Sequence, residues 1–293
     1  MDRDNEVIDF QKTTIYVNCT ESYAVRIIVD ILNGFVNAIT LTFRKSGITI
    51  TEYNQKQCIL MNYIIEEEWL QGYTYNLLDV YNRPVESYSF KVAPQELLAA
   101  IKGVEGKRAF LIFYIEVQCD GTNSGVDLSM TNISGNEFIK SFGFCDPIIE
   151  SDNIYELEYL GRPTSARLAL GIFSNIIARF KGRRCNIIDF TLKGSGRIFV
   201  TGRRGTEVLS ANYLDTFASD DASKDMVKAD EDPDIHTIKM SVSETSWLVK
   251  LTRLNTGGII QVYLRDKLPL ILRTKMASIG YIVYSFRDDP HIK

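Results

Sequence analysis

The chain has 293 residues, 45% of them hydrophobic, which is enough for one large domain or two of ordinary size. Its formal net charge of −4 is unusual for a protein that holds nucleic acid by surface attraction alone. No run approaches the roughly 18 apolar residues of a membrane-spanning helix, so a membrane protein is not expected. The five cysteines form no CxxC pair, and we expect them to be reduced and mostly buried.

Four amphipathic helices are predicted at near-even spacing, each followed by two or three β-rich runs. They begin near Ser22, Pro94, Ile172 and Ser243. The second opens with a proline suited to a first helical turn and ends at Gly103 and Gly106. The expected buried sets are Ala24, Ile27, Ile28, Ile31, Leu32 and Phe35 in the first helix, Ile172, Phe173, Ile176, Ile177 and Phe180 in the third, and Trp247, Leu251 and Leu254 in the fourth.

Between the helices the apolar period changes to two, which predicts strands over 38–43, 109–114 and 259–264. Turn residues at 44–47, 121–125, 193–196 and 265–267 predict hairpins. Antiparallel sheets with helices on one face make an α+β fold. An acidic, aromatic-dotted segment predicts a connector at 147–164 between domains at 1–146 and 165–293, and a second acidic stretch, 219–233, predicts a long hairpin loop.

Catalytic motifs are scarce. With His236 and His291 as its only histidines, the chain offers little for a His-dependent triad or a multi-histidine metal site. The glycines at 193–197 lack the phosphate-binding pattern and favour a β-turn. The acidic runs at 220–221 and 230–232 could hold a divalent ion, but a solvated loop is the better interpretation. We therefore expect no enzyme, no metal and no cofactor.

Three stretches together resemble a known family. Residues 15–58 have a strand, a helix, a strand, a Ser-Gly hairpin and a strand in the family's order, and residues 156–163 form an acidic, apolar segment that closes on Leu-Gly-Arg-Pro. Residues 268–275 and 280–286 are similar to the family's final strand pair, including its proline. Over nearly its whole length the chain resembles a sliding clamp of the proliferating cell nuclear antigen (PCNA) type.

This resemblance implies a ring of three chains around double-stranded DNA, with two similar domains in each chain and helices lining the inside. The four helix segments carry ten basic and four acidic residues, although the whole chain is acidic. On the second helix Leu97 and Ala100 occupy positions where the family is basic. The alternative is that the basic residues are only the solvated faces of amphipathic helices. The predicted DNA-binding residues are Arg26, Lys102, Lys107, Arg108, Arg179, Lys181, Arg183, Arg184, Lys250 and Arg253.

The resemblance also implies a pocket for a short docking peptide of a DNA polymerase, clamp loader, ligase or nuclease. Arg162 and Tyr53 depart from the family's side chains there, so the peptide preference is expected to differ. The alternative is that Leu268 and Pro269 only close a hairpin. The predicted pocket residues are Tyr53, Cys58, Leu160, Leu268, Pro269, Ser285 and Phe286.

In the family, subunits join by pairing edge strands, and by resemblance residues 137–144 would pair with 206–213 of a neighbour in a homotrimer. Two alternatives remain. One is a processivity factor that works without closing a ring, and the other is a subunit of a heterotrimer similar to the checkpoint clamp. The resemblance implies the nucleus, or a viral replication compartment if the chain is viral.

Overall fold

The fold is described from a computed structural model. It covers residues 13–54, 56, 58–77, 83–101, 110–117, 125–131, 137–142, 166–193, 198–214, 234–255, 257–265 and 268–287. The predicted connector at 147–164 and the acidic loop at 219–233 lie outside these ranges. The division into two domains therefore stays a prediction.

Strands dominate the chain and helices interrupt them four times. The first half contains β1 (Thr13–Cys19), α1 (Ser22–Asn33), β2 (Ile39–Arg44), β3 (Gly47–Tyr53), β4 (Ile59–Glu66), the 3₁₀ turn η1 (Glu67–Trp69), β5 (Gly72–Asn76), β6 (Ser87–Val92), α2 (Pro94–Ile101), β7 (Phe110–Val117), β8 (Gly125–Thr131) and β9 (Glu137–Phe142). The second half contains β10 (Ala166–Ala169), α3 (Leu170–Gly182), β11 (Ile187–Lys193), β12 (Ile198–Arg204), β13 (Glu207–Leu214), β14 (Asp234–Ser241), α4 (Val242–Thr245), the 3₁₀ segment η2 (Ser246–Arg253), β15 (Ile259–Tyr263), β16 (Leu270–Met276) and β17 (Gly280–Phe286). The predicted strands at 38–43, 109–114 and 259–264 are confirmed as β2, β7 and β15.

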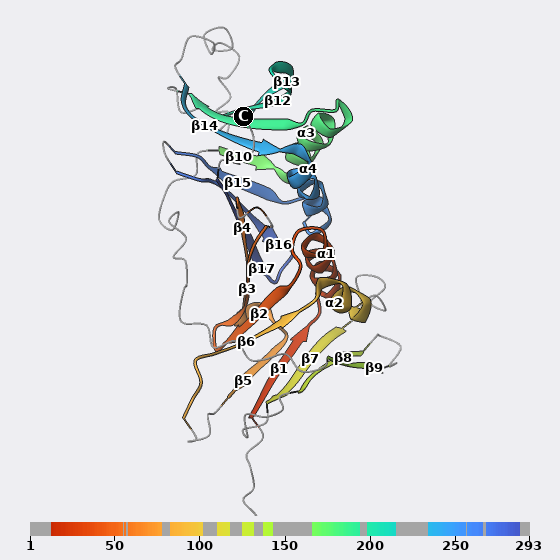
Figure 1. The fold of residues 1–293 in the computed structure, drawn as a ribbon. Coiled ribbons are helices and arrows are strands. Elements are labelled where there is room, and N and C mark those ends of the chain that lie inside the picture. The colour runs from red at the N-terminus through yellow and green to blue at the C-terminus, as the bar shows by residue number, and fades with distance from the viewer. Residues whose placement is uncertain are drawn as a thin grey trace, which may run out of the picture.

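The described strands form three antiparallel sheets. Their orders are β5-β1-β7-β8-β9, β10-β15-β16-β17-β4-β3-β2-β6 and β13-β12-β11-β14. The eight-stranded sheet joins the two halves because β17 pairs with β4 from Tyr281↔Ile64 to Phe286↔Ile59. The helices follow one another down one side of the molecule, with the sheets behind them (Figure 1). The arrangement confirms the α+β fold class, with helices on one side of antiparallel sheets.

The helix layer covers an apolar core that is continuous through both halves. All six predicted core residues of the first helix are buried, since their spacing places them on one face. The helix spacing alone was therefore enough to identify this face. Within the described ranges, every helix is too short or too polar to span a bilayer.

The third helix differs from the prediction at its start. It begins at Leu170, and Ile172, expected in the core, is 55% exposed. The apolar stripe runs instead through Leu170, Phe173 and Ile177, at helical spacing, which leaves Ile172 outside it.

The fourth helix also differs, because only Val242–Thr245 is α-helical and Ser246–Arg253 is a 3₁₀ segment. Hydroxyl groups bond to main-chain carbonyls three residues back in this segment, from Ser246 to Ser243 (3.1 Å) and from Thr252 to Val249 (3.0 Å). Such bonds compete with the α-helical pattern. The expected packing of Trp247, Leu251 and Leu254 is nevertheless confirmed.

Candidate nucleic-acid and docking surfaces

The C-terminal end of α3 carries the densest group of predicted DNA-binding residues. The side chains of Arg179, Lys181, Arg183 and Arg184 are all exposed. Cationic side chains at the end of a helix also stabilise its negative pole, so this position by itself fits the solvated-face alternative too. What the structure establishes is that four cationic side chains lie together on the helix layer.

Arg184 has an uncommon backbone conformation at this helix end. The Cys185 N–H donates to the Phe180 carbonyl (3.0 Å) and the Arg184 N–H to the Lys181 carbonyl (3.0 Å). This pattern is a Schellman cap, in which the residue at the Arg184 position usually is glycine. Arg184 has φ +56°, in the left-handed region, so an arginine is held where glycine would be less strained.

A second basic group lies where α1, α2 and η2 meet. A groove of about 560 Å³ is lined by both Arg26 and Arg253, with Asp30 also in its wall. Lys250 does not project freely beside them, because its Nζ lies 2.8 Å from Asp30 Oδ2. Lys102, Lys107 and Arg108 lie outside the described residues. The cations at the end of α3 are thus exposed, whereas near α1 one cation, Lys250, is paired with an acid. All these DNA-binding assignments stay predictions.

The predicted docking residues separate onto different surfaces. Tyr53 and Ser285 lie on the face of the eight-stranded sheet that points away from the helices, where each is register partner of Leu60. Phe286 follows Ser285 along a strand, so it points the opposite way and is buried in the core. Leu160 lies outside the described residues.

An apolar group on this outer face was missed by the sequence reasoning. Ile271 is the register partner of both Ser285 and Tyr263, and Leu60, Ile271 and Tyr263 are each less than 10% exposed. The period-two alternation in β4, β15 and β16 could have identified them, but their pairing across strands could not be read from the sequence.

Leu268 and Pro269, the other two predicted docking residues, are half-buried just before β16. The Leu268 carbonyl lies 3.1 Å from His236 Nε2 on β14, which fixes this turn to the neighbouring sheet. The pair thus has a structural contact that fits the hairpin alternative, and its docking role stays a prediction.

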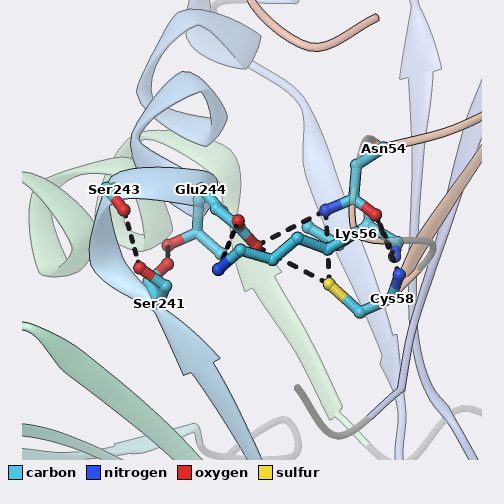
Figure 2. A network of polar contacts seen from close by, with 8 residues as sticks. Asn54, Lys56, Cys58, Ser241, Ser243 and Glu244 are labelled. Atoms are coloured by element: carbon cyan, nitrogen blue, oxygen red, sulfur yellow. Dashed lines mark hydrogen bonds and ion pairs between the residues drawn. The ribbon is translucent and has the colours of Figure 1, made fainter. Parts of the chain in front are cut away.

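Cys58 belongs to a polar network rather than to an open pocket. Figure 2 shows Asn54, Lys56 and Cys58 facing Glu244 of α4. Asn54 Oδ1 accepts the N–H groups of Cys58 (2.8 Å) and Ile59 (3.0 Å), and Cys58 Sγ donates to Glu244 Oε2 (3.6 Å). Lys56 Nζ lies 2.8 Å from Glu244 Oε1. The loop between β3 and β4 is therefore fixed to the second half of the chain.

Aromatic side chains fill the junction behind this loop. The hydroxyl groups of Tyr63 on β4 and Tyr284 on β17 lie 3.0 Å apart, and both side chains are fully buried. Trp247 of η2 packs on Tyr284 with ring centroids 4.4 Å apart and meets Phe35 edge to face at 5.6 Å. Burial raises the pKa of both tyrosines above the usual value near 10, so their hydroxyl groups stay protonated and can share a hydrogen bond.

Both strands predicted to join subunits end a sheet. Among the described strands, β9 is last in the five-stranded sheet and β13 is last in the four-stranded sheet. Val208 on β13 is 50% exposed. An edge strand offers unpaired main-chain groups to a further strand, so both are able to extend a sheet.

The described residues contain no group of three or more His, Cys, Asp or Glu that could hold a metal ion. The acidic run at 230–232, the possible ion site, lies outside them.

Comparison with solved structures identifies the fold. One match is a crystal structure of a PCNA2–PCNA3 complex from Sulfolobus tokodaii, with TM-score 0.65 and 15% identity over 93% of this chain and 98% of the other. Another is PCNA from Entamoeba histolytica, with TM-score 0.67 and 13% identity over 94% of this chain and 98% of the other. No family model and no curated protein matches the sequence. The chain has the PCNA sliding-clamp fold in a divergent form, which confirms at the level of the fold the resemblance found in the sequence.

Proposed function

We propose that this chain is a DNA sliding clamp, a non-enzymatic processivity factor that encircles double-stranded DNA and tethers replication and repair proteins. The observation that carries the proposal is the clamp fold over more than nine-tenths of the chain. The exposed cationic side chains of α3 and η2, on the same helix layer, support it. Contacts with phosphates are independent of base sequence and weaken with salt, which suits a protein that must slide.

The proposed assembly is a homotrimer closed by pairing of β9 with β13 of the next subunit. Both strands are sheet edges, and pairing them would remove exposed edges from the particle. A heteromeric ring is the second candidate, because one of the matched structures is a complex of PCNA2 with PCNA3. A processivity factor that does not close a ring is the third.

The DNA-binding proposal is tested by removing cations from α3. Replacing Arg179, Lys181 and Arg183 with alanine is expected to weaken association with duplex DNA. It should also flatten the plot of log affinity against log salt by up to about 0.9 for each phosphate that the variant no longer neutralises. Arg184 is left in place because its strained backbone would couple DNA binding to stability. Fluorescence anisotropy over a salt series provides the measurement.

The matched control removes three exposed lysines from the strands and a hairpin turn, at Lys45, Lys91 and Lys239. It lowers the net charge of the chain by the same amount. The proposal requires that the control slope stay near that of the unchanged chain. Equal slopes for the two triple variants would show that α3 does not face DNA.

We further propose that partner proteins dock on the outer face around Tyr53 and Ser285. A peptide with an aliphatic residue followed by two aromatic residues is expected to bind there, because Leu60 and Ile271 beside Ser285 are apolar. Ser285→Arg should weaken the peptide by roughly 2 kcal/mol, since it introduces a charge among apolar anchors. Calorimetric titration tests this, with Thr74→Arg on β5 as an exposed control. Equal affinity of Ser285→Arg and the unchanged chain would move the docking site elsewhere.

A further inference from the structure

A lysine from the second half of the chain caps the C-terminal end of α1. Lys250 of η2 donates to Asp30 in two places, to Oδ2 at 2.8 Å and to the main-chain carbonyl oxygen at 3.3 Å. Both contacts join residues 220 positions apart in the sequence. The ion pair therefore forms only when the two halves are in their folded arrangement.

The contact also satisfies the end of α1. The last four carbonyls of a helix have no partner within the helix, and they form its negative pole. The Gly34 N–H bonds to the Ile31 carbonyl rather than to that of Asp30, and the last turn of α1 has no basic residue of its own. Lys250 supplies both the missing hydrogen-bond donor and the positive charge.

We infer that Lys250 is a structural tether, held by Asp30, and that its charge does not contribute to the DNA-contacting surface. This inference rests on the proposed function, because it concerns which cations of that surface contact DNA. For Lys250 to reach a phosphate it would have to leave both acceptors of Asp30, and an unpaired carboxylate would then face the DNA. Arg253 has no such role, and it provides the comparison.

Arg253 is a close match for position and environment. It follows Lys250 by three residues, one turn of the 3₁₀ segment, so the two side chains leave the same face of η2. Arg253 is exposed and lines the groove that Arg26 also lines. The same surface thus presents one cation bound to an acid and another that borders the open groove.

The first test compares charge-neutral removal of the pair with removal of Arg253. The double variant Asp30→Asn/Lys250→Gln is expected to keep the slope of log affinity against log salt for duplex DNA. Arg253→Gln is expected to reduce that slope by about 0.9, which corresponds to one phosphate contact. Asp30→Asn alone should steepen the slope by up to about 0.9, because it releases Lys250 toward DNA. A reduction of the same size in the double variant and in Arg253→Gln would overturn the inference.

The second test needs no DNA. Melting temperatures of Asp30→Asn, Lys250→Gln and the double variant form a thermodynamic cycle. If the two side chains act as one tether, each single variant lowers the melting temperature and the double variant lowers it no further than the larger single loss. Additive losses would overturn the tether. If the unchanged chain shows no salt-dependent DNA association, the proposed function fails, while this cycle still decides whether the tether exists.

Discussion

Trp247 packs against one aromatic ring of the first half and two of β17, the strand that pairs with β4 of the first half, so its truncation should destabilise the whole protein. It is 8% exposed and belongs to the second half, while Phe35 at its edge belongs to the first. Its ring also lies parallel to that of Phe286 (6.4 Å between centroids) and packs against Tyr284. Trp247→Ala removes all three ring pairs and leaves a cavity beneath η2.

The expected cost of Trp247→Ala is about 3–5 kcal/mol, the range for large aromatic truncations in a core. Aromatic pairs contribute about 0.5–1.5 kcal/mol beyond area burial, so three of them place this position toward the upper part of the range. Trp247→Phe should cost less than Trp247→Ala, because it removes fewer buried atoms and leaves a smaller cavity. Its smaller ring keeps part of the packing and removes a buried Nε1–H that finds no acceptor among the described residues.

Urea unfolding followed by far-ultraviolet circular dichroism measures both variants. Protein concentration must be held constant, because assembly stabilises the folded chain by mass action. A change below about 0.5 kcal/mol for Trp247→Ala would refute the view that this cluster holds the halves together, since ordinary surface substitutions give changes of that size. Equal losses for the two variants would refute the role assigned to the ring contacts.

Three further predictions concern stability. Gly280→Ala should lower the free energy of unfolding by on the order of 1–3 kcal/mol, because Gly280 has φ +148° and an added Cβ would clash with a main-chain oxygen of β4. Gly257→Ala, which has open space around it, is the control and should be nearly neutral in the same urea titration. Arg184→Gly should raise the free energy of unfolding by roughly 1 kcal/mol by relieving a left-handed arginine, and no gain would contradict the strain argument. Burial raises the pKa of Tyr63 and of Tyr284, so above pH 10 unfolding releases their protons and the free energy of unfolding should fall as pH rises. This fall should be smaller in Tyr63→Phe, and urea titrations at pH 8 and above pH 10 compare the variant with the unchanged chain.

Local patterns in the sequence were sufficient for the elements whose form depends on one face. The apolar stripe of α1 predicted its buried residues, and alternation predicted β2, β7 and β15, because burial of a single face dictates the period. The same alternation separates Ser285 from Phe286, although the two were assigned together to one pocket. The resemblance assigned both residues to the docking site from the order of the elements alone. Consecutive side chains on a strand point to opposite faces of the sheet, so the two residues lie on different faces.

Long-range pairing was beyond the reach of the sequence. Nothing near Lys250 indicates that its partner is Asp30, and nothing near Cys58 indicates Glu244, 186 residues away. The 3₁₀ form of η2 depends on serine and threonine hydroxyl groups that compete with the helix pattern, while its apolar spacing still fits an α-helix. Tertiary contacts thus decide which predicted cation is available and which predicted pocket residue is enclosed.

The size of the purified chain in solution tests the central claim most directly. A closed homotrimer of a 33.3 kDa chain should scatter light as a single particle of about 100 kDa at roughly ten micromolar. Replacing exposed Val208 on the edge strand β13 with lysine should shift that particle toward the monomer, because a charged side chain on an edge strand opposes pairing with another chain. A monomer of 33.3 kDa for the unchanged chain under these conditions would contradict the homotrimeric ring.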